Sequence, residues 1–205
     1  MTTRDLRQHL SAAAIVPILS AGGDDPLARA DALVEHGATV IEVLFRHPGA
    51  AALLAAIGAR HPGLLLAAGT ILDAEGAARA VAAGADVMVS PGFSPTLHAA
   101  AQGAGLPLIP GVNTASEVQH ARELGYPVQK FYPAWDYGHQ RLPEFHAIYP
   151  DVSFLVTGAL TSAQVLEFAR HPNVAALGGT WMLRDATALA TDRARFRAAR
   201  SGCAS

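Results

Sequence analysis

The chain has 205 residues and a mass of 21.3 kDa, a size that suits one domain or at most two small ones. Hydrophobic residues make up 51% of it and charged residues 16%, so the chain can bury a full core and is not intrinsically disordered. The net charge of −2 excludes a basic surface for nucleic acid or an anionic membrane, and no apolar run reaches the roughly 18 residues that span a bilayer. We therefore expect a soluble, cytoplasmic protein without a secretory signal. The single cysteine, Cys203, excludes a disulfide within the chain and a cysteine-based zinc site.

Two kinds of sequence pattern, one typical of strands and one typical of helices, alternate along the chain. Short apolar runs rich in β-branched residues predict strands, and the stretches between them, rich in alanine, leucine and arginine, have apolar residues at helical spacing. The helical spacing is clearest in 25–36, 73–84 and 114–125. The predicted strands are, in chain order, Ile15–Ser20, Thr39–Phe45, Leu64–Thr70, Val87–Gly92, Pro107–Gly111, Val128–Ala134, Ser153–Gly158 and Val174–Thr180.

Helix start and stop signals agree with this alternation. Side chains that cap helix N-termini stand at Asp73, Thr114 and Thr161. Glycines follow three helical stretches, at Gly37, Gly84 and Gly125. Eight strands alternating with eight helices wind into one parallel sheet that closes as a (β/α)8 barrel.

We predict an α/β fold, a compact single-domain (β/α)8 TIM barrel over residues 1–205. An open doubly wound sheet is the alternative, although that architecture tends to use five or six strands. The polar segment Asp192–Ser205 is expected to form a final helix with a short flexible tail.

Lysine is the rarest basic residue in this chain. Of the 15 basic residues, 14 are arginines, and the only lysine is Lys130, in the middle of an apolar predicted strand. Arginine replaces lysine where only charge is needed, but it stays protonated and cannot act as an amine nucleophile. If Lys130 faces the barrel interior, burial favours the neutral amine that attacks a carbonyl and forms a Schiff base. The alternatives are chance survival, and a lysine on the outer face whose stem covers a helix.

A second charged pair lies on the predicted strand Thr39–Phe45. Glu42 is flanked by apolar residues, and a carboxylate buried there is costly unless it is paired. Arg46 is four residues further on and therefore points to the same side. In a barrel, Glu42 would then be an acid/base group in the interior, and Arg46 would bind an anion near the open end. The alternative is that the two residues form only a structural ion pair.

Small residues end the other predicted strands, where the chemistry of such barrels lies. Strands end in Thr70, Ser90-Pro91-Gly92 and Ile109-Pro110-Gly111, and the last two end in Thr157-Gly158 and Gly178-Gly179-Thr180. Loops at these last two positions commonly bind phosphate, because glycines expose backbone N–H groups; tight turns alone are the alternative. The histidines are scattered without metal-ligand spacing, so a mechanism without metal or cofactor is favoured.

Taken together, these residues resemble the 2-keto-3-deoxy-6-phosphogluconate (KDPG)/4-hydroxy-2-oxoglutarate (KHG) aldolase family. The resemblance runs from about Ile15 to Trp181 and is carried by the order and spacing of short motifs. These are Val16-Pro17-Ile18, Glu42-Val43-Leu44-Phe45-Arg46, Ala68-Gly69-Thr70-Ile71-Leu72, Ser90-Pro91-Gly92, Ile109-Pro110-Gly111-Val112, Lys130-Phe131-Tyr132-Pro133-Ala134, Thr157-Gly158 and Gly178-Gly179-Thr180-Trp181.

The resemblance implies a class I aldolase and assigns roles to the matching positions. Lys130 matches the lysine that forms the Schiff base with pyruvate, and Glu42 matches the general acid/base. Arg46, helped by Thr70, matches the group that binds the pyruvate carboxylate. The remaining implied substrate contacts are Pro91, Phe131, Thr157 near the hydroxyl-bearing carbon, and Gly158, Gly178, Gly179 and Thr180 at the phosphate end.

This chain departs from the family pattern around the aldehyde end of the substrate. Ala159 stands where a second glycine is common after Gly158, and the segment 135–139 is bulkier than expected. Leu44 and His47 replace residues that are often threonine. These changes affect the substrate tail more than the pyruvate chemistry.

The expected reaction is cleavage of a 2-keto-3-deoxy-6-phospho sugar acid, or of 4-hydroxy-2-oxoglutarate, to pyruvate and an aldehyde, either glyceraldehyde 3-phosphate or glyoxylate. A phosphogalactonate-type substrate and a non-phosphorylated 4-hydroxy-2-oxo acid remain alternatives. So do a phosphate-binding barrel that uses Lys130 as a general base without an imine, and a non-catalytic keto-acid-binding barrel. The resemblance also implies a homotrimer and a place in the Entner–Doudoroff pathway.

Overall fold

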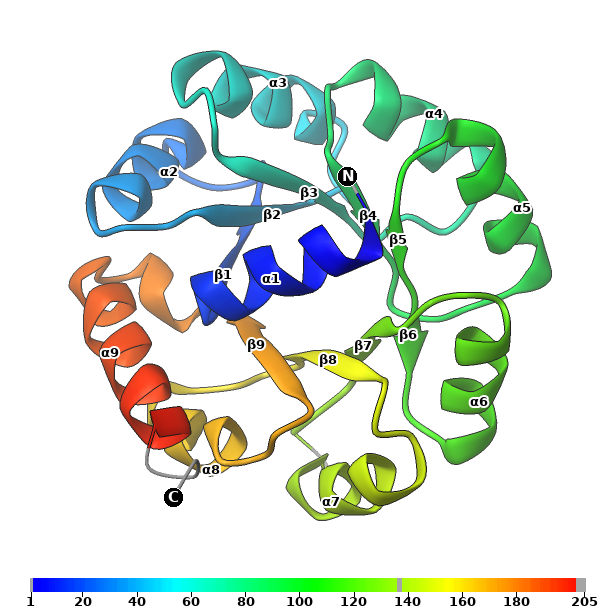
Figure 1. Ribbon diagram of the computed structural model, residues 1–205. Helices are drawn as coiled ribbons and strands as arrows, with labels where there is room; N and C mark the ends of the chain where they lie inside the picture. Colours follow the sequence, from blue (N-terminus) through cyan, green and yellow to red (C-terminus); the bar gives the residue numbers. More distant parts are fainter. Residues whose placement is uncertain (1, 136–137, 202–205) are drawn as a thin grey trace.

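A computed structural model describes residues 2–135 and 138–201 (Figure 1). Within these residues the strands form a single nine-stranded sheet in which every paired neighbour is parallel. The strands are β1 (Ile15–Ser20), β2 (Val40–Leu44), β3 (Leu65–Gly69), β4 (Val87–Val89), β5 (Leu108–Ile109), β6 (Gly111–Val112), β7 (Val128–Phe131), β8 (Ser153–Thr157) and β9 (Val174–Gly179).

The sheet closes into a barrel through a strand that Pro110 interrupts. The order of strands runs β5-β4-β3-β2-β1-β9-β8-β7-β6, so the two strands at the ends, β5 and β6, are consecutive in the chain. Pro110 separates them, and its carbonyl accepts a hydrogen bond from the Lys130 backbone N–H at 2.8 Å. The predicted strand Pro107–Gly111 therefore occupies one strand position of the barrel as two short strands, β5 and β6. The predicted (β/α)8 barrel is confirmed.

Helices surround the sheet in the ring that Figure 1 shows. They are α1 (Thr3–Ala13), α2 (Pro26–Glu35), α3 (Ala50–Arg60), α4 (Ala74–Ala82), α5 (Pro95–Ala104), α6 (Ala115–Glu123), α7 (Gly138–Ile148), α8 (Val165–Ala169) and α9 (Thr187–Ser201). Two short 3-10 turns, η1 (Ser162–Gln164) and η2 (Trp181–Leu183), precede α8 and α9. Among the described residues, no helix has the length and apolar character that crossing a bilayer requires.

The predicted helix signals lie where helices begin and end. Asp73 caps α4 by accepting a hydrogen bond from Gly76, and Thr114 forms a reciprocal capping box with Glu117 at the start of α6. Thr161 instead precedes the 3-10 turn η1. The final helix begins at Thr187, earlier than Asp192, and the predicted tail at 202–205 lies outside the described residues.

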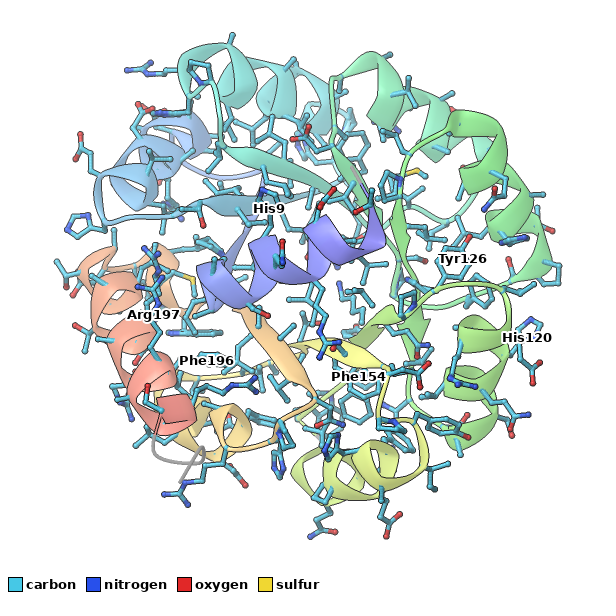
Figure 2. All side chains as sticks on the ribbon, viewed as in Figure 1. His9, His120, Tyr126, Phe154, Phe196 and Arg197 are labelled. Carbon is cyan, nitrogen blue, oxygen red and sulfur yellow. The ribbon has the colours of Figure 1, made fainter. Side chains whose placement is uncertain are left out.

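Two separate apolar cores hold the fold together. The larger one fills the space between the sheet and the outer helices, and it includes Phe154 on β8 and Phe196 on α9 (Figure 2). The smaller one lies inside the barrel, where valines such as Val40, Val87 and Val128 meet at its centre. The barrel interior is therefore a packed apolar core toward the N-terminal ends of the strands, which we call the lower end.

Helix α1, which the sequence patterns above do not predict, closes the N-terminal end of the barrel. It lies across the opening in Figure 1, and Leu6 and Leu10, each 1% exposed, belong to the inner core. A capping box between Thr2 and Asp5 begins the helix. This helix keeps water away from the lower end of the barrel interior.

The inner core predicts a large cost for truncating the α1 side chains. Leu10→Ala should lower the free energy of unfolding by about 2–5 kcal/mol, because it leaves a cavity at the sealed end of the barrel. Urea denaturation measures this change, with the exposed Gln8→Ala on the same helix as the control. Equal stability of the two variants would contradict the role of α1 as a plug.

Candidate active site

A buried lysine and a buried glutamate meet inside the barrel. Lys130 on β7 lies with its Nζ 3.2 Å from Glu42 Oε1 on β2, and the two residues are 5% and 0% exposed. Strands β1, β9 and β8 lie between β2 and β7 in the sheet, so the contact crosses the barrel interior. The amine faces the interior and not the surrounding helices.

Strand alternation explains both orientations. On β2, Val40 belongs to the inner core and Ile41 to the outer core, so Glu42 points inward. On β7, Val128 points inward in the same way, which places Lys130 inside and above it. Gly69 on β3 leaves the space that the Glu42 side chain occupies, because a Cβ at that position would overlap the carboxylate.

Phe131 does not lie at this site, contrary to the substrate contact that the family resemblance implies. Its ring is fully buried on the helix side of β7, with ring centroids 6.1 Å from Phe145 and 6.0 Å from Phe154. Adjacent strand residues point to opposite faces, so Phe131 must face outward when Lys130 faces inward. Phe131 is a core residue of the outer layer.

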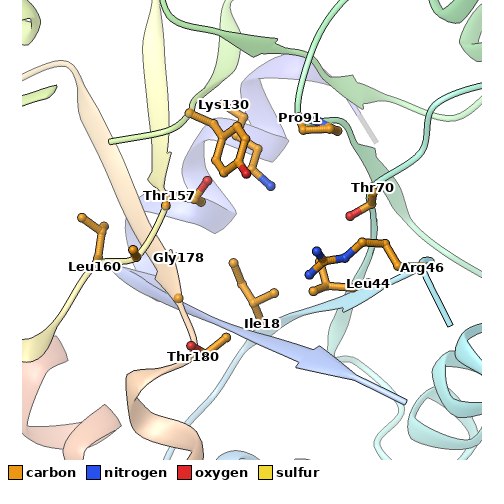
Figure 3. A pocket seen from close by; sticks show the side chains of 14 residues that line it. Ile18, Leu44, Arg46, Thr70, Pro91, Lys130, Thr157, Leu160, Gly178 and Thr180 are labelled. Carbon is orange, nitrogen blue, oxygen red and sulfur yellow. The ribbon is translucent and has the colours of Figure 1, made fainter. Parts of the chain in front are cut away.

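A cavity of about 250 Å³ opens above the lysine at the C-terminal ends of the strands (Figure 3). The other residues proposed from the sequence line this cavity, except Glu42, which contacts the lining residue Lys130. They are Arg46, Thr70, Pro91, Lys130, Thr157, Gly158, Gly178, Gly179 and Thr180.

Further wall residues were not singled out as contacts from the sequence: Ile18, Leu44, Tyr132, Ala159 and Leu160. The ring centroid of Tyr132 lies 5.5 Å from Lys130 Nζ, at cation–π distance. The signal for Tyr132 was its position two residues after the lysine, on the same side of the chain. His47 is exposed and does not line the cavity, and Trp135 is 64% exposed at the end of the described segment.

Arg46 brings a second positive charge to the cavity. Figure 3 shows its guanidinium approaching from the side opposite Lys130, with the Thr70 hydroxyl beside it. No carboxylate lies within salt-bridge distance of Arg46 in the part of the chain that the structure describes. A guanidinium that points into a cavity without a carboxylate partner is suited to binding a ligand carboxylate in a bidentate manner.

Two buried polar atoms beside the amine have no hydrogen-bond partner within the described residues. They are Glu42 Oε2 and Thr157 Oγ1. Buried polar atoms without partners are rare in folded proteins, and Figure 3 places Thr157 next to Lys130. Of the two residues, Thr157 lines the cavity, and Glu42 contacts the lining residue Lys130.

The cavity wall contains backbone held in the left-handed region. Thr70 has φ of 62° and Ala159 has φ of 48°, although neither is glycine. Such conformations cost free energy, most of all for a β-branched residue, and they concentrate at functional sites. Ala159 therefore keeps the backbone that a glycine adopts easily, and it lines the cavity.

Glycines at the ends of β8 and β9 line the cavity at positions where a Cβ would collide with neighbouring protein atoms. A Cβ on Gly158 would lie 2.8 Å from Ala134 N, and one on Gly178 would lie 2.8 Å from Thr157 Cγ2. A Cβ on Gly179 would overlap the Trp181 ring. We call Gly158, Ala159, Gly178, Gly179 and Thr180 the glycine cup.

No group of three metal-binding side chains occurs among the residues with described positions. The arrangement that does occur is an amine, an acid/base group, a guanidinium and a cup lined with backbone. These groups define the class of protein: a barrel enzyme that can capture a keto acid covalently on lysine.

Comparison with known proteins gives the same class. The family model described as "KDPG and KHG aldolase" matches residues 6–198. The 2-dehydro-3-deoxy-phosphogluconate aldolase of Treponema pallidum is 43% identical over 159 residues, which cover 77% of this chain and 75% of that protein.

Two solved structures are similar over almost the whole chain, each at 30% identity. The KDPG aldolase of Zymomonas mobilis ZM4 with 3-phosphoglycerate has a TM-score of 0.87, with 95% of this chain and 97% of that chain covered. The Legionella pneumophila enzyme, with pyruvate captured as a covalent carbinolamine, has a TM-score of 0.83, with 97% and 98% covered.

The chain belongs to the KDPG and KHG aldolase family. It is an aldolase, a carbon–carbon lyase of class I that acts through a Schiff base.

The position of Gly69 predicts that Gly69→Ala displaces the Glu42 carboxylate from Lys130. The added methyl group would overlap the Glu42 carboxylate, which must then move, and we expect kcat for aldol cleavage to fall at least about tenfold. A coupled assay of pyruvate release measures the loss.

The matched control is Gly103→Ala on α5, where nothing lies within 4 Å of the added methyl group. That variant should keep wild-type kcat. A Gly69→Ala variant that folds and has full activity would show that the position of Glu42 does not matter.

Proposed function

We propose that this aldolase cleaves a 2-keto-3-deoxy-6-phospho sugar acid to pyruvate and glyceraldehyde 3-phosphate, and 4-hydroxy-2-oxoglutarate to pyruvate and glyoxylate. Lys130 is the Schiff-base lysine and Glu42 the general acid/base. The observation that carries the proposal is the 3.2 Å contact between Lys130 Nζ and Glu42 Oε1 at the base of a cavity that also exposes Arg46.

Arg46 and Thr70 bind the carboxylate of the keto acid. Arg46 lies across the cavity from Lys130, so a carboxylate held there directs the neighbouring 2-oxo group toward the amine. Fixing the reacting carbonyl in this way converts a bimolecular encounter into a step within one complex. Pro91 and Tyr132 limit the space beside the carbonyl.

The reaction begins when the neutral amine of Lys130 attacks C2. The resulting carbinolamine loses water to form a protonated imine, in which the nitrogen attracts electrons. Removal of the C4 hydroxyl proton lets the C3–C4 bond break, with its electron pair moving into the imine to form an enamine. The aldehyde leaves, the enamine is protonated at C3, and hydrolysis of the imine returns pyruvate and the free amine.

Glu42 is placed to move the protons that these steps require. Its Oε1 lies next to the amine, where it can accept the proton that the ammonium must lose. Its unpartnered Oε2 is free to accept the C4 hydroxyl proton, directly or through water, and to return a proton to C3. Thr157 Oγ1, also unpartnered, orients that hydroxyl.

The glycine cup binds the far end of the substrate. Backbone N–H groups at glycines are suited to phosphate oxygens, and the Thr180 hydroxyl adds a donor. The Zymomonas mobilis relative described with 3-phosphoglycerate supports a phosphorylated tail. Leu44 and Ala159 also line the cavity. Assays with a phosphogalactonate-type substrate and with non-phosphorylated 4-hydroxy-2-oxo acids would measure which tails the enzyme accepts.

A non-catalytic barrel that only binds keto acids would need Arg46 but not a buried amine beside a buried carboxylate. Burying both charged groups costs free energy that a simple binding site avoids. The buried pair of Lys130 and Glu42 would also suit an enzyme in which Lys130 acts only as a general base without forming an imine. That role does not specifically require a lysine.

Lys130→Arg should abolish cleavage, reducing kcat to about one thousandth or less, because a guanidinium stays protonated and forms no imine. In the wild type, borohydride reduction with pyruvate present should add the mass of the reduced adduct to the peptide containing Lys130. Mass spectrometry of the digested protein makes the measurement. Absence of the adduct at saturating pyruvate would reject the mechanism, and Lys130→Arg is the negative control.

We also propose that the chain works in the cytoplasm, in the Entner–Doudoroff pathway, as a homotrimer. The family resemblance supports the trimer, and so do large apolar side chains left exposed near the cavity end, Leu72 at 59% and Trp135 at 64%. Light scattering should give three times the chain mass of 21.3 kDa. A mass of one or two chains at micromolar concentration would contradict the trimer.

A further inference from the structure

A fully buried carboxylate joins the two loops that form the glycine cup, yet it does not line the cavity. Asp192 on α9 is 0% exposed and lies on the same helix face as the buried Leu189 and Phe196. Its Oδ1 accepts hydrogen bonds from Ser162 Oγ at 2.8 Å and Arg195 Nη1 at 2.8 Å. Its Oδ2 accepts one from Trp181 Nε1 at 2.9 Å.

The two oxygens of Asp192 therefore bond to different loops. Ser162 follows β8 four residues after Gly158, and Trp181 follows β9 directly after Thr180. The Trp181 ring lies against Gly179 so closely that a Cβ there would overlap it. Arg195 strengthens the first connection, because its Nη1 also donates to the Ser162 carbonyl at 2.9 Å.

We propose that Asp192 is a positioning residue that holds the two walls of the glycine cup at the separation a phosphate group requires. The inference rests on the proposed function, since it assumes that the cup binds the phosphorylated tail. Backbone N–H groups from two loops can donate hydrogen bonds to the same tetrahedral anion only if the distance between the loops stays fixed. One rigid carboxylate that bonds to both loops sets that spacing.

The energetics of the site fit a positioning role. Burying a carboxylate costs desolvation free energy that an apolar residue on this face of α9 would avoid. Here three donors offset that cost, and two of them come from the cup loops. The pyruvate end is held elsewhere, by residues on and after β2 and on β7, so its chemistry does not depend on Asp192.

Variants of the two partners test the proposal better than removal of Asp192, which would leave Arg195 without its buried partner and destabilise the fold. Trp181→Phe keeps a ring against Gly179 but removes the N–H donor to Oδ2. Ser162→Ala removes the donor to Oδ1 from the other loop. Asp31→Asn is the control, because Asp31 also pairs with Arg60 and His61 but joins α2 to α3.

The assay is condensation of pyruvate with two acceptors, glyceraldehyde 3-phosphate and glyceraldehyde. Each partner variant should raise KM for the phosphorylated acceptor by roughly five- to tenfold, the effect of losing about one hydrogen bond. KM for glyceraldehyde and the rate of borohydride trapping with pyruvate should stay within about twofold of the wild type. Asp31→Asn should change none of these values.

The outcomes separate this inference from the proposed function. Equal losses on both acceptors, or an unchanged KM for the phosphorylated acceptor, would overturn the positioning role. A wild-type enzyme that traps pyruvate but does not prefer the phosphorylated acceptor would overturn it too, while leaving the aldolase mechanism intact. A wild-type enzyme that traps no pyruvate would reject the proposed function itself.

Discussion

The contact between Lys130 and Glu42 is the interaction on which the rest of the site depends. A buried ion pair is stable only when both groups are held in good geometry, because each has lost its water. The barrel supplies that geometry by bringing β2 and β7 to opposite sides of one apolar interior. Helix α1 closes the interior from below, and Gly69 leaves the space for the carboxylate. The closed apolar interior that stabilises the fold therefore also holds Lys130 and Glu42 in the geometry that the site needs.

The cavity divides into two ends with different physical characters. The pyruvate end is made of three ionisable side chains, Glu42 on β2, Lys130 on β7 and Arg46 in the turn after β2. The tail end is made mostly of backbone in two loops, which need support from behind. Asp192 supplies that support from α9, a helix outside the barrel. A change at the tail end can therefore alter which aldehyde is accepted without disturbing imine formation.

One expected departure from the family pattern, Ala159, lies at this tail end. Ala159 takes a left-handed conformation that glycine would adopt at lower cost, and it lines the cavity. Leu44 also lines the cavity, at the end of β2 beside Arg46. Both residues contribute apolar side chains to the cavity lining.

Local patterns in the sequence were sufficient for the order of strands and helices, because period and capping depend on neighbours in the chain. They also identified the single lysine, the buried glutamate and the strand-end glycines. The prediction that Phe131 lies at the cavity was wrong. Adjacent strand residues point to opposite faces of the sheet, so Phe131 must point outward when Lys130 points inward. Helix α1 as a plug, the Lys130–Glu42 contact over 88 residues and the burial of Asp192 within a polar segment depended on tertiary structure. Each arises from barrel closure, which brings together residues whose partners are distant in the chain and leave no local pattern.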